Sequence, residues 1–328
     1  MGGRGGRGGR QSGHLEEAGR SAGLHEGRPG PLGQEGVIPL SGEERARWIC
    51  ELLRRAAVRA PRFVKESLIK VKEREEGHAR AQIESILENL EMAEAEGVPL
   101  CQDTGLPFFF VQFGTDVSSE ELGAWLSALE GGVKLATESV PLRPNAVDPL
   151  SRANSGDNLG RGMPMVDLEL YPAMRGMRIQ VTIKGAGSEN MTALKLFSPG
   201  AKWREIELWV LERVLEAGGK PCPPTFLGLG VGGTAALSLK LAERALLRAP
   251  SRNEDASIAL LEEELFELVN ELGVGPMGLG GNTTVLGTFV EVANTHTATL
   301  PVALKFCCWA YRRASLRVSG EEAWLEDM

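Results

Sequence analysis

The stretch Val98-Pro-Leu-Cys-Gln-Asp-Thr-Gly-Leu-Pro-Phe-Phe-Phe-Val111 places a thiol and a carboxylate directly before an apolar run that is typical of a buried β-strand. Turn chemistry accounts for Asp103, Thr104 and Gly105, because these residue types favour tight bends. It does not account for Cys101, although a cysteine taken alone is more often a small buried hydrophobe than a ligand. The stretch therefore predicts a bend at a strand entrance, where reactive groups are presented.

Two further cysteines stand in a similar setting downstream. Cys222 lies between prolines ahead of a glycine run that ends at Thr234, and Cys308 follows His296, the only histidine in the second half of the chain. Three isolated cysteines beside glycine or proline suit an iron-sulfur cluster with three protein ligands. Such a cluster leaves one iron open as a Lewis acid for a hydroxyl or carboxylate, which favours dehydration chemistry over electron transfer.

Length, composition and net charge limit the classes of protein to which this chain can belong. The chain has 328 residues, of which 42% are hydrophobic, so it can form one large or two ordinary domains. Its net charge of -8 argues against a nucleic-acid-binding protein as a whole. No apolar run approaches about 18 residues, so no membrane span is expected, and none follows the basic N-terminus as in a secretory signal. The five cysteines fit a reducing compartment, and we expect a cytoplasmic protein.

Three segments are predicted along the chain. Residues 1–36 are rich in glycine and arginine and poor in apolar side chains, which predicts a disordered tail. Residues 37–315 are predicted to form one catalytic domain, and 316–328 a C-terminal tail. The opening Gly-Arg repeats resemble an RNA-binding tract, so the alternative function is that of a non-enzymatic RNA-associated protein.

Hydrophobic periodicity predicts a mixture of helices and strands. Ser41 and Glu44 have the spacing of a capping box at the start of the first helix. Residues 166–171 and 177–183 are predicted to be strands that pair with each other. The further helices are expected over 63–96, 118–139, 200–217, 234–248 and 258–272, with strands ending at Phe113 and Gly230. The class is α+β, or mixed α/β, with a helical N-terminal region followed by a strand-helix domain whose glycine-rich loops would surround the cluster.

Other sites fit the residues less well. Gly228-Leu-Gly-Val-Gly-Gly233 satisfies the dinucleotide glycine pattern, but the acidic residue that should end the next strand falls between two predicted helices. No Gly-Lys-Ser or Gly-Lys-Thr completes a phosphate-binding loop. The cysteines lack the short spacing of structural zinc sites. A thiol nucleophile formed by Cys308 and His296 is conceivable, although nothing marks an oxyanion site.

Four motifs, in this order, closely resemble the alpha subunit of class I fumarate hydratase and of L(+)-tartrate dehydratase. They are Cys101-Gln-Asp-Thr-Gly105, Lys184-Gly-Ala-Gly-Ser188, Cys222-Pro-Pro with Gly-Gly-Thr234, and Leu300-Pro-Val-Ala through Cys308 to Arg312. The similarity covers about residues 41–315.

The resemblance implies a 4Fe-4S cluster held by Cys101, Cys222 and Cys308. It also implies catalytic roles for Asp103 and His296. Substrate would be bound by Gln102, Asp103, Arg143, Gly185 and Gly187, and the planar fork of Arg143 suits a carboxylate. The sequence departs from the family at Ala186, Cys307 and Trp309, so the choice between Cys307 and Cys308 as the iron ligand stays open.

Single-chain members of this family carry a further C-terminal domain that supplies threonine, arginine and lysine to the active site. This chain ends at Met328 without such a region. The resemblance therefore implies a beta subunit in a heterodimer or α2β2 assembly, and a small dicarboxylate substrate. Fumarate hydrated to malate is favoured, dehydration of tartrate to oxaloacetate is possible, and neither nucleic acid nor membrane is expected as a partner.

Overall fold

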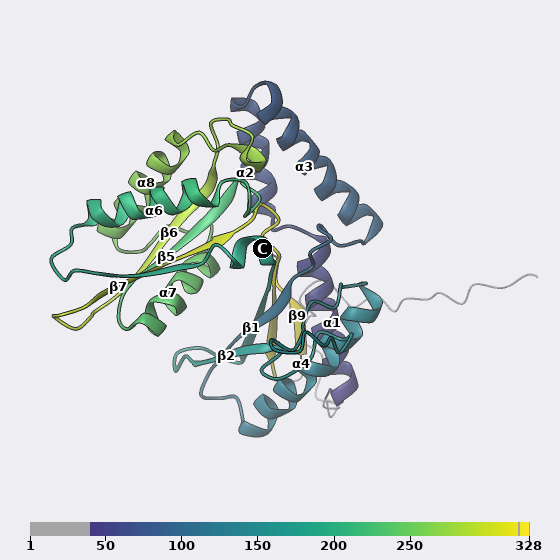
Figure 1. The fold of residues 1–328 in the computed structure, drawn as a ribbon. Helices are drawn as coiled ribbons and strands as arrows, with labels where there is room; N and C mark the ends of the chain where they lie inside the picture. The colour runs from purple at the N-terminus through teal and green to yellow at the C-terminus, as the bar shows by residue number, and fades with distance from the viewer. Residues whose placement is uncertain (1–39, 321, 328) are drawn as a thin grey trace, which may run out of the picture.

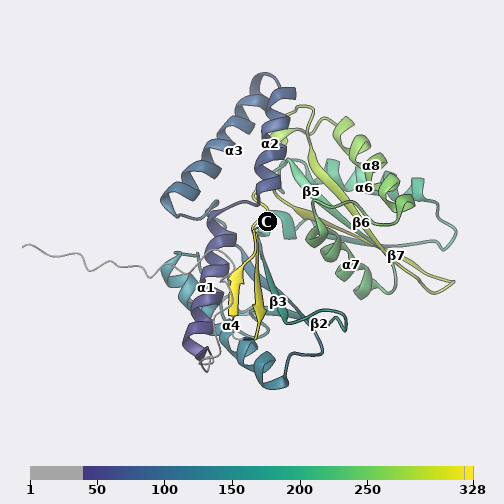
Figure 2. The ribbon, with the colours of Figure 1, turned by 180° about the vertical axis from the view of Figure 1, so that it is seen from behind.

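A computed structural model of the protein describes residues 40–320 and 322–327. The tail expected over residues 1–36 lies outside them. Two mixed β-sheets stand beside each other, each covered by its own helices (Figures 1 and 2). The mixed class of fold predicted from the sequence is confirmed. None of the described helices is both long and apolar enough to cross a bilayer.

The first sheet has the strand order β2-β1-β3-β8-β9. Helices α1 and α4 pack on it, and their buried face includes Ile49, Leu53 and Trp125, which share one core with Phe109 and Ile179 of the strands. Ser41 caps α1 through the predicted capping box. The elements are α1 (Gly42–Val58), β1 (Leu106–Phe113), α4 (Ser119–Ser139), β2 (Met165–Leu170), β3 (Met177–Lys184), β8 (Arg313–Ser319) and β9 (Glu322–Leu325).

The second sheet has the order β4-β7-β5-β6 and is covered on both faces. Leu227 and Leu229 of β5 belong to the core formed with α6 and α8, whereas Gly228 and Gly230 face α7. A Cβ atom at Gly230 would lie 1.9 Å from the carbonyl oxygen of Ser238 in α7, so these glycines serve close helix packing. The elements are β4 (Ala193–Phe197), α6 (Trp203–Ala217), β5 (Thr225–Gly232), α7 (Ala235–Arg248), α8 (Ala256–Glu271), β6 (Val285–Ala293) and β7 (Leu300–Cys307).

The helix expected over residues 63–96 is two helices. Helix α2 (Arg62–Arg74) ends before Glu75, whose backbone is extended, and α3 (Gly77–Glu96) begins at Gly77, which has φ +53°. Glu75 itself is buried, and its Oε2 accepts a hydrogen bond of 3.0 Å from the Asn282 amide. The break therefore lets α2 and α3 fold against each other and hold the loop before β6. The remaining elements are the short helices α5 (Ala186–Glu189) and η1 (Pro276–Gly278).

Two expectations about the first sheet are corrected. Strands β2 and β3 do not pair, because β1 lies between them, parallel to β2 and antiparallel to β3. The buried side chains of β3 on both faces suit this inner position, whereas β2 exposes every second residue and forms the edge. The tail expected from residue 316 is largely strand, because Leu316 and Val318 of β8 are fully buried in the core and β9 pairs with β8.

Candidate functional site

The Cys101 bend is anchored between two helices and the start of β1. The Leu100 amide donates to the Ala57 carbonyl at the end of α1 over 2.9 Å, and the Asn89 side chain of α3 donates to the Leu100 carbonyl over 3.0 Å. Cys101 is half-buried, and its Sγ lies 3.8 Å from Oε1 of Gln102, whose side chain is exposed. The bend thus presents the thiol at the junction of the two sheets.

The Cys222 turn links α6 to β5. Cys222 has φ +55°, a conformation that is uncommon for a residue other than glycine. The Pro223 carbonyl accepts a hydrogen bond of 2.7 Å from the Met277 amide. A Cβ atom at Gly219 would lie 2.7 Å from the Met277 carbonyl oxygen. The glycine-rich loop around η1 therefore clamps this turn in an unusual backbone conformation.

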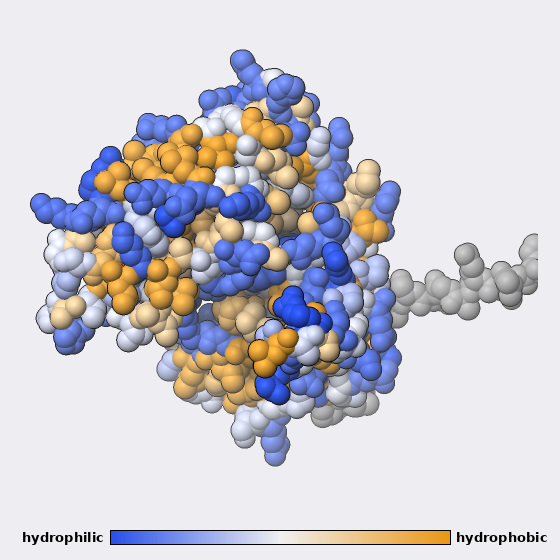
Figure 3. Space-filling model, in the orientation of Figure 1, coloured by the Kyte–Doolittle hydropathy of each residue, from blue (hydrophilic) through white to orange (hydrophobic). Residues whose placement is uncertain are grey.

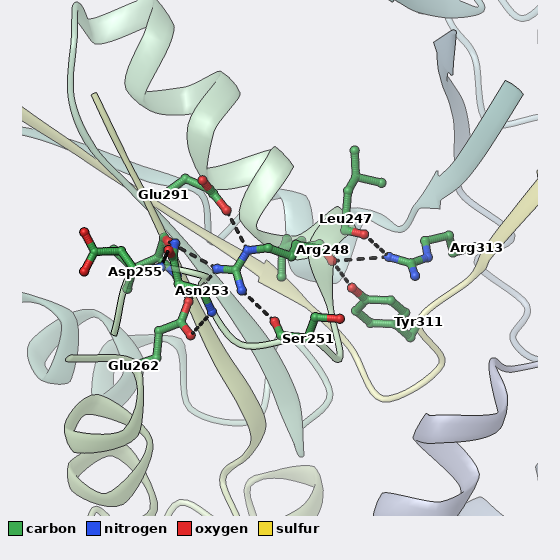
Figure 4. A network of polar contacts seen from close by, with 11 residues as sticks. Leu247, Arg248, Ser251, Asn253, Asp255, Glu262, Glu291, Tyr311 and Arg313 are labelled. Atoms are coloured by element: carbon green, nitrogen blue, oxygen red, sulfur yellow. Dashed lines mark hydrogen bonds and ion pairs between the residues drawn. The ribbon is translucent and has the colours of Figure 1, made fainter. Parts of the chain in front are cut away.

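Cys308 directly follows β7 and begins a turn into β8. The Tyr311 amide donates to the Cys308 carbonyl over 3.1 Å. The end of the turn is fixed at the end of α7, where Figure 4 shows Arg313 beside Leu247. The Tyr311 hydroxyl donates to the Leu246 carbonyl, and Arg313 donates to the carbonyls of Leu247 and Ala249. Cys308 is thereby held by both sheets and by α7.

The three cysteines predicted as ligands converge. Burial raises the pKa of Cys222, and the neighbouring thiols of Cys308 and Cys101 raise it further. Burial, followed by the neighbouring Cys308, raises the pKa of Cys307 to about 12, and the positive charge of Lys184 opposes this shift. Cys308 thus lies near both Cys222 and Cys307, and Lys184 lies near Cys307.

This donor set fits a cluster better than a single ion. In the described residues, no three side chains of histidine, cysteine, aspartate or glutamate meet closely enough to hold one metal ion. In an iron-sulfur cluster each cysteine binds a different iron, so the thiols stand further apart. Arg312, which is 5% exposed with a buried Nε that lacks a partner, lies within electrostatic range of Cys222. Its positive charge suits the electron-rich sulfurs that such a cluster would bring.

Asp103 connects the Cys101 bend to the glycine loop at residues 185–188. Its Oδ1 accepts from the Gly105 amide over 3.1 Å, and its Oδ2 accepts from the Ala186 amide over 2.8 Å. Arg312 donates through Nη1 to the Asp103 carbonyl. A Cβ atom at Gly185 would lie 2.6 Å from Nη2 of Arg312 and 3.1 Å from Oδ2 of Asp103. The absence of a side chain at Gly185 thus permits this arrangement.

The Arg143 backbone is fixed beside the same bend. Its amide donates to Thr104 Oγ1 over 2.9 Å, and its carbonyl accepts from Asn158 Nδ2 over 3.1 Å. Asn158 is 1% exposed, has φ +62°, and accepts from the Asn145 amide over 2.6 Å. The Arg143 side chain is exposed and makes no ion pair with the described residues. Its guanidinium is therefore available to an anion.

His296 lies elsewhere. It occupies the loop between β6 and β7, is exposed, and accepts at Nδ1 from the Ala298 amide over 3.1 Å. The whole length of β7 separates it from Cys308, which at about 3.3 Å per strand residue is roughly 25 Å, and the loop lies far from the sheet junction in Figure 1. Within one chain, the structure does not bring His296 to the cysteines.

A cavity of 450 Å³ borders Asp103 and the glycine loop, between the two sheets. Its polar lining includes Lys184 and Lys305, which both form ion pairs with the buried Glu243. Sequence reasoning did not assign roles to these residues, nor to Arg312 or Asn158. Lys184 and Arg312 stand at the ends of two of the motifs, whereas nothing in the sequence marks Glu243, which lies in an ordinary amphipathic helix.

Comparison with known proteins identifies the family of this chain. The model of the family described as "Fumarate hydratase (Fumerase)" matches residues 46–317. The chain is 46% identical over 273 residues to "Putative L(+)-tartrate dehydratase subunit alpha" of Methanocaldococcus jannaschii, a match covering 82% of this chain and 96% of the relative. It is 34% identical over 238 residues to "L(+)-tartrate dehydratase subunit alpha" of Escherichia coli K12, covering 72% and 78%. It is 33% identical over 279 residues to "Putative fumarate hydratase class I" of Geobacillus stearothermophilus, covering 82% of this chain and 54% of that protein.

Proposed function

Because the chain belongs to the fumarate hydratase family, we propose that it is the alpha subunit of a 4Fe-4S-dependent hydro-lyase that acts reversibly on a small dicarboxylate. The observation that carries this proposal is the convergence of Cys101, Cys222 and Cys308 beside Arg312. We assign the cluster to these three thiols. When bound, the cluster would supply a Lewis acid for the hydroxyl that is added or removed.

The residues around the cysteines suit a dicarboxylate. Arg143 offers a free guanidinium on a fixed backbone, and we assign it one substrate carboxylate. Gln102, Gly185 and Gly187 would position the substrate with side-chain and backbone donors. Each oxygen of Asp103 accepts one backbone hydrogen bond and keeps a lone pair, so this carboxylate can bind the substrate hydroxyl or exchange a proton with it.

Hydration adds a hydroxyl to one olefinic carbon of fumarate and a proton to the other, giving malate. Dehydration of tartrate removes a hydroxyl and the proton on the neighbouring carbon, and the resulting enol becomes oxaloacetate. Two relatives named as tartrate dehydratase alpha subunits, one of them 46% identical, support tartrate as the second candidate substrate.

A beta subunit is part of the proposal. Relatives are named as alpha subunits, and the relative named as a class I fumarate hydratase extends well beyond the matched region. Figure 3 shows apolar side chains at the surface over α6, α8 and the β4 edge, where Leu196, Leu215 and Leu260 are exposed. Such patches commonly mark interfaces. We propose a heterodimer or α2β2 assembly, and a cytoplasmic location.

The test is anaerobic reconstitution of the chain with iron and sulfide, alone and with the matching beta subunit. Consumption of fumarate and of L-tartrate should appear only in the complex, and the preferred substrate identifies the activity. Chain that remains colourless after reconstitution and shifts RNA in a gel would instead support the RNA-associated alternative.

A further inference from the structure

A buried ion-pair network joins the two sheets behind the glycine loop. Lys184 ends β3, Lys305 lies in β7 and Glu243 lies in α7. The Lys184 Nζ atom is 2.8 Å from Glu243 Oε1, and the Lys305 Nζ atom is 2.9 Å from Oε2. The side chains of Lys184, Lys305 and Glu243 are 9%, 12% and 4% exposed. One carboxylate therefore holds two lysines from different sheets.

The network reaches both ends of the glycine loop. Lys184 directly precedes Gly185, and Glu189 closes the loop, with its Oε1 3.5 Å from the same Lys305 Nζ atom. Between these ends, the Ala186 amide donates to Asp103 over 2.8 Å, and the Glu189 amide donates to the Gly185 carbonyl over 3.1 Å. Glu243 thus anchors the first end directly and the second end through Lys305.

The loop has little room to move. A Cβ atom at Gly105 would lie 2.4 Å from the Lys184 carbonyl oxygen, and one at Gly187 would lie 2.9 Å from the Lys220 carbonyl oxygen. The loop is therefore packed against backbone on both sides. A shift of Lys184 would be transmitted to Ala186 and to its hydrogen bond with Asp103.

The ion pair between Glu243 and Lys184 favours the charged form of both groups. Burial alone would raise the pKa of Glu243, but Lys184 and Lys305 outweigh burial and lower it. Burial alone would lower the pKa of Lys184, but the neighbouring groups, Glu243 first among them, together raise it. Removal of the carboxylate would leave the buried Lys184 ammonium group without its ion-pair partner and Lys305 with Glu189 alone, and unpaired buried charges are strongly unfavourable.

We propose that Glu243 is a positioning residue that fixes the glycine loop at residues 185–188 against Asp103 through Lys184, Lys305 and Glu189. The proposal rests on the proposed function in one respect, since it takes the loop to bind substrate. Its structural part, the clamp on the loop, stands on the contacts alone.

The clamp is tested by hydrogen exchange of the full-length chain carrying Glu243→Gln. The amides of residues 186–191 should exchange at least tenfold faster than in the wild type, because they depend on the anchored ends. The matched control is Glu262→Gln, which removes an equally buried carboxylate paired with Arg248 over 2.5 Å (Figure 4). That control should leave exchange at 186–191 unchanged.

Unchanged exchange in Glu243→Gln, or equal acceleration in both variants, would overturn the proposal. If Glu243→Gln yields no folded chain, Lys305→Met applies the same test to the Glu189 end, where residues 189–191 should exchange faster. In the reconstituted complex, Glu243→Gln should raise KM for the dicarboxylate about tenfold and change kcat, expressed per cluster, by less. Glu243→Asp should restore part of the loss. A wild-type complex without hydro-lyase activity would refute the proposed function and leave the exchange result to decide the clamp.

Discussion

Gly185→Ala tests the site by filling the space beside Asp103. The added methyl group would lie 2.6 Å from Nη2 of Arg312, about 0.8 Å closer than ordinary contact. Gly185 has φ -81° and ψ 147°, which alanine adopts without strain, so the effect is steric. Arg312 cannot move freely, because it is 5% exposed and its Nη1 donates to the Asp103 carbonyl.

The expected magnitude follows from this geometry. Overpacking of this kind costs about 1–3 kcal/mol of the free energy of unfolding. A displacement near 1 Å at reacting groups costs about 10²-fold in rate, so kcat/KM should fall by about two orders of magnitude if Asp103 and the loop bind substrate.

The assay is fumarate absorbance with the anaerobically reconstituted complex, with turnover normalised to visible cluster absorbance. Gly200→Ala is the matched control, because its Cβ atom would meet nothing within 4 Å, and it should retain wild-type activity. A Gly185→Ala complex whose kcat/KM stays within twofold of the wild type would refute the placement of this loop at the active site.

Three further results are expected. Single replacement of Cys101, Cys222 or Cys308 by serine should abolish the visible absorbance of the brown, air-sensitive cluster, whereas Cys50→Ser and Cys307→Ser should retain it. Retention of the cluster in Cys308→Ser together with its loss in Cys307→Ser would show that Cys307 is the ligand. Asn158→Ala should lower the free energy of unfolding in urea by about 1–3 kcal/mol, since it leaves buried groups unpaired. It should also raise KM by releasing the backbone at Arg143, and an unchanged KM would contradict the role of Asn158 in positioning Arg143. Because Glu243 has a lowered pKa in the folded chain, its stabilising contribution is present above its ordinary pKa of 4.5 and is lost as pH falls through the folded value. Below pH 4.5, the free energy of unfolding should therefore fall more steeply with decreasing pH in the wild type than in Glu243→Gln. Identical slopes in the two proteins would contradict the ion pairs of Glu243.

Local chemistry predicted many of the elements and the family. The capping box at Ser41 and the helix that follows Ser118 are confirmed, because these signals depend on residues within one turn. The family resemblance is confirmed as well. The order of strands was not predictable in the same way, since β3 pairs with β1 and not with β2, the strand directly before it in the sequence. Pairing with the next strand in sequence is only the commoner choice.

The site itself depends on distances that sequence spacing does not measure. His296 and Cys308 are close in the sequence, yet most of the residues between them form the extended strand β7 and carry them apart. Arg312 and Asp103 are 209 residues apart in sequence and in direct contact. The difference arises because Gly185 and Cys308 directly follow β3 and β7, while Cys101 and Cys222 lie in the turns that lead into β1 and β5, where the two sheets adjoin. Side chains near strand ends are brought together by the order of strands, so only the folded chain reveals which of the predicted residues lie near one another and which buried charges, such as Glu243, lie beside the glycine loop.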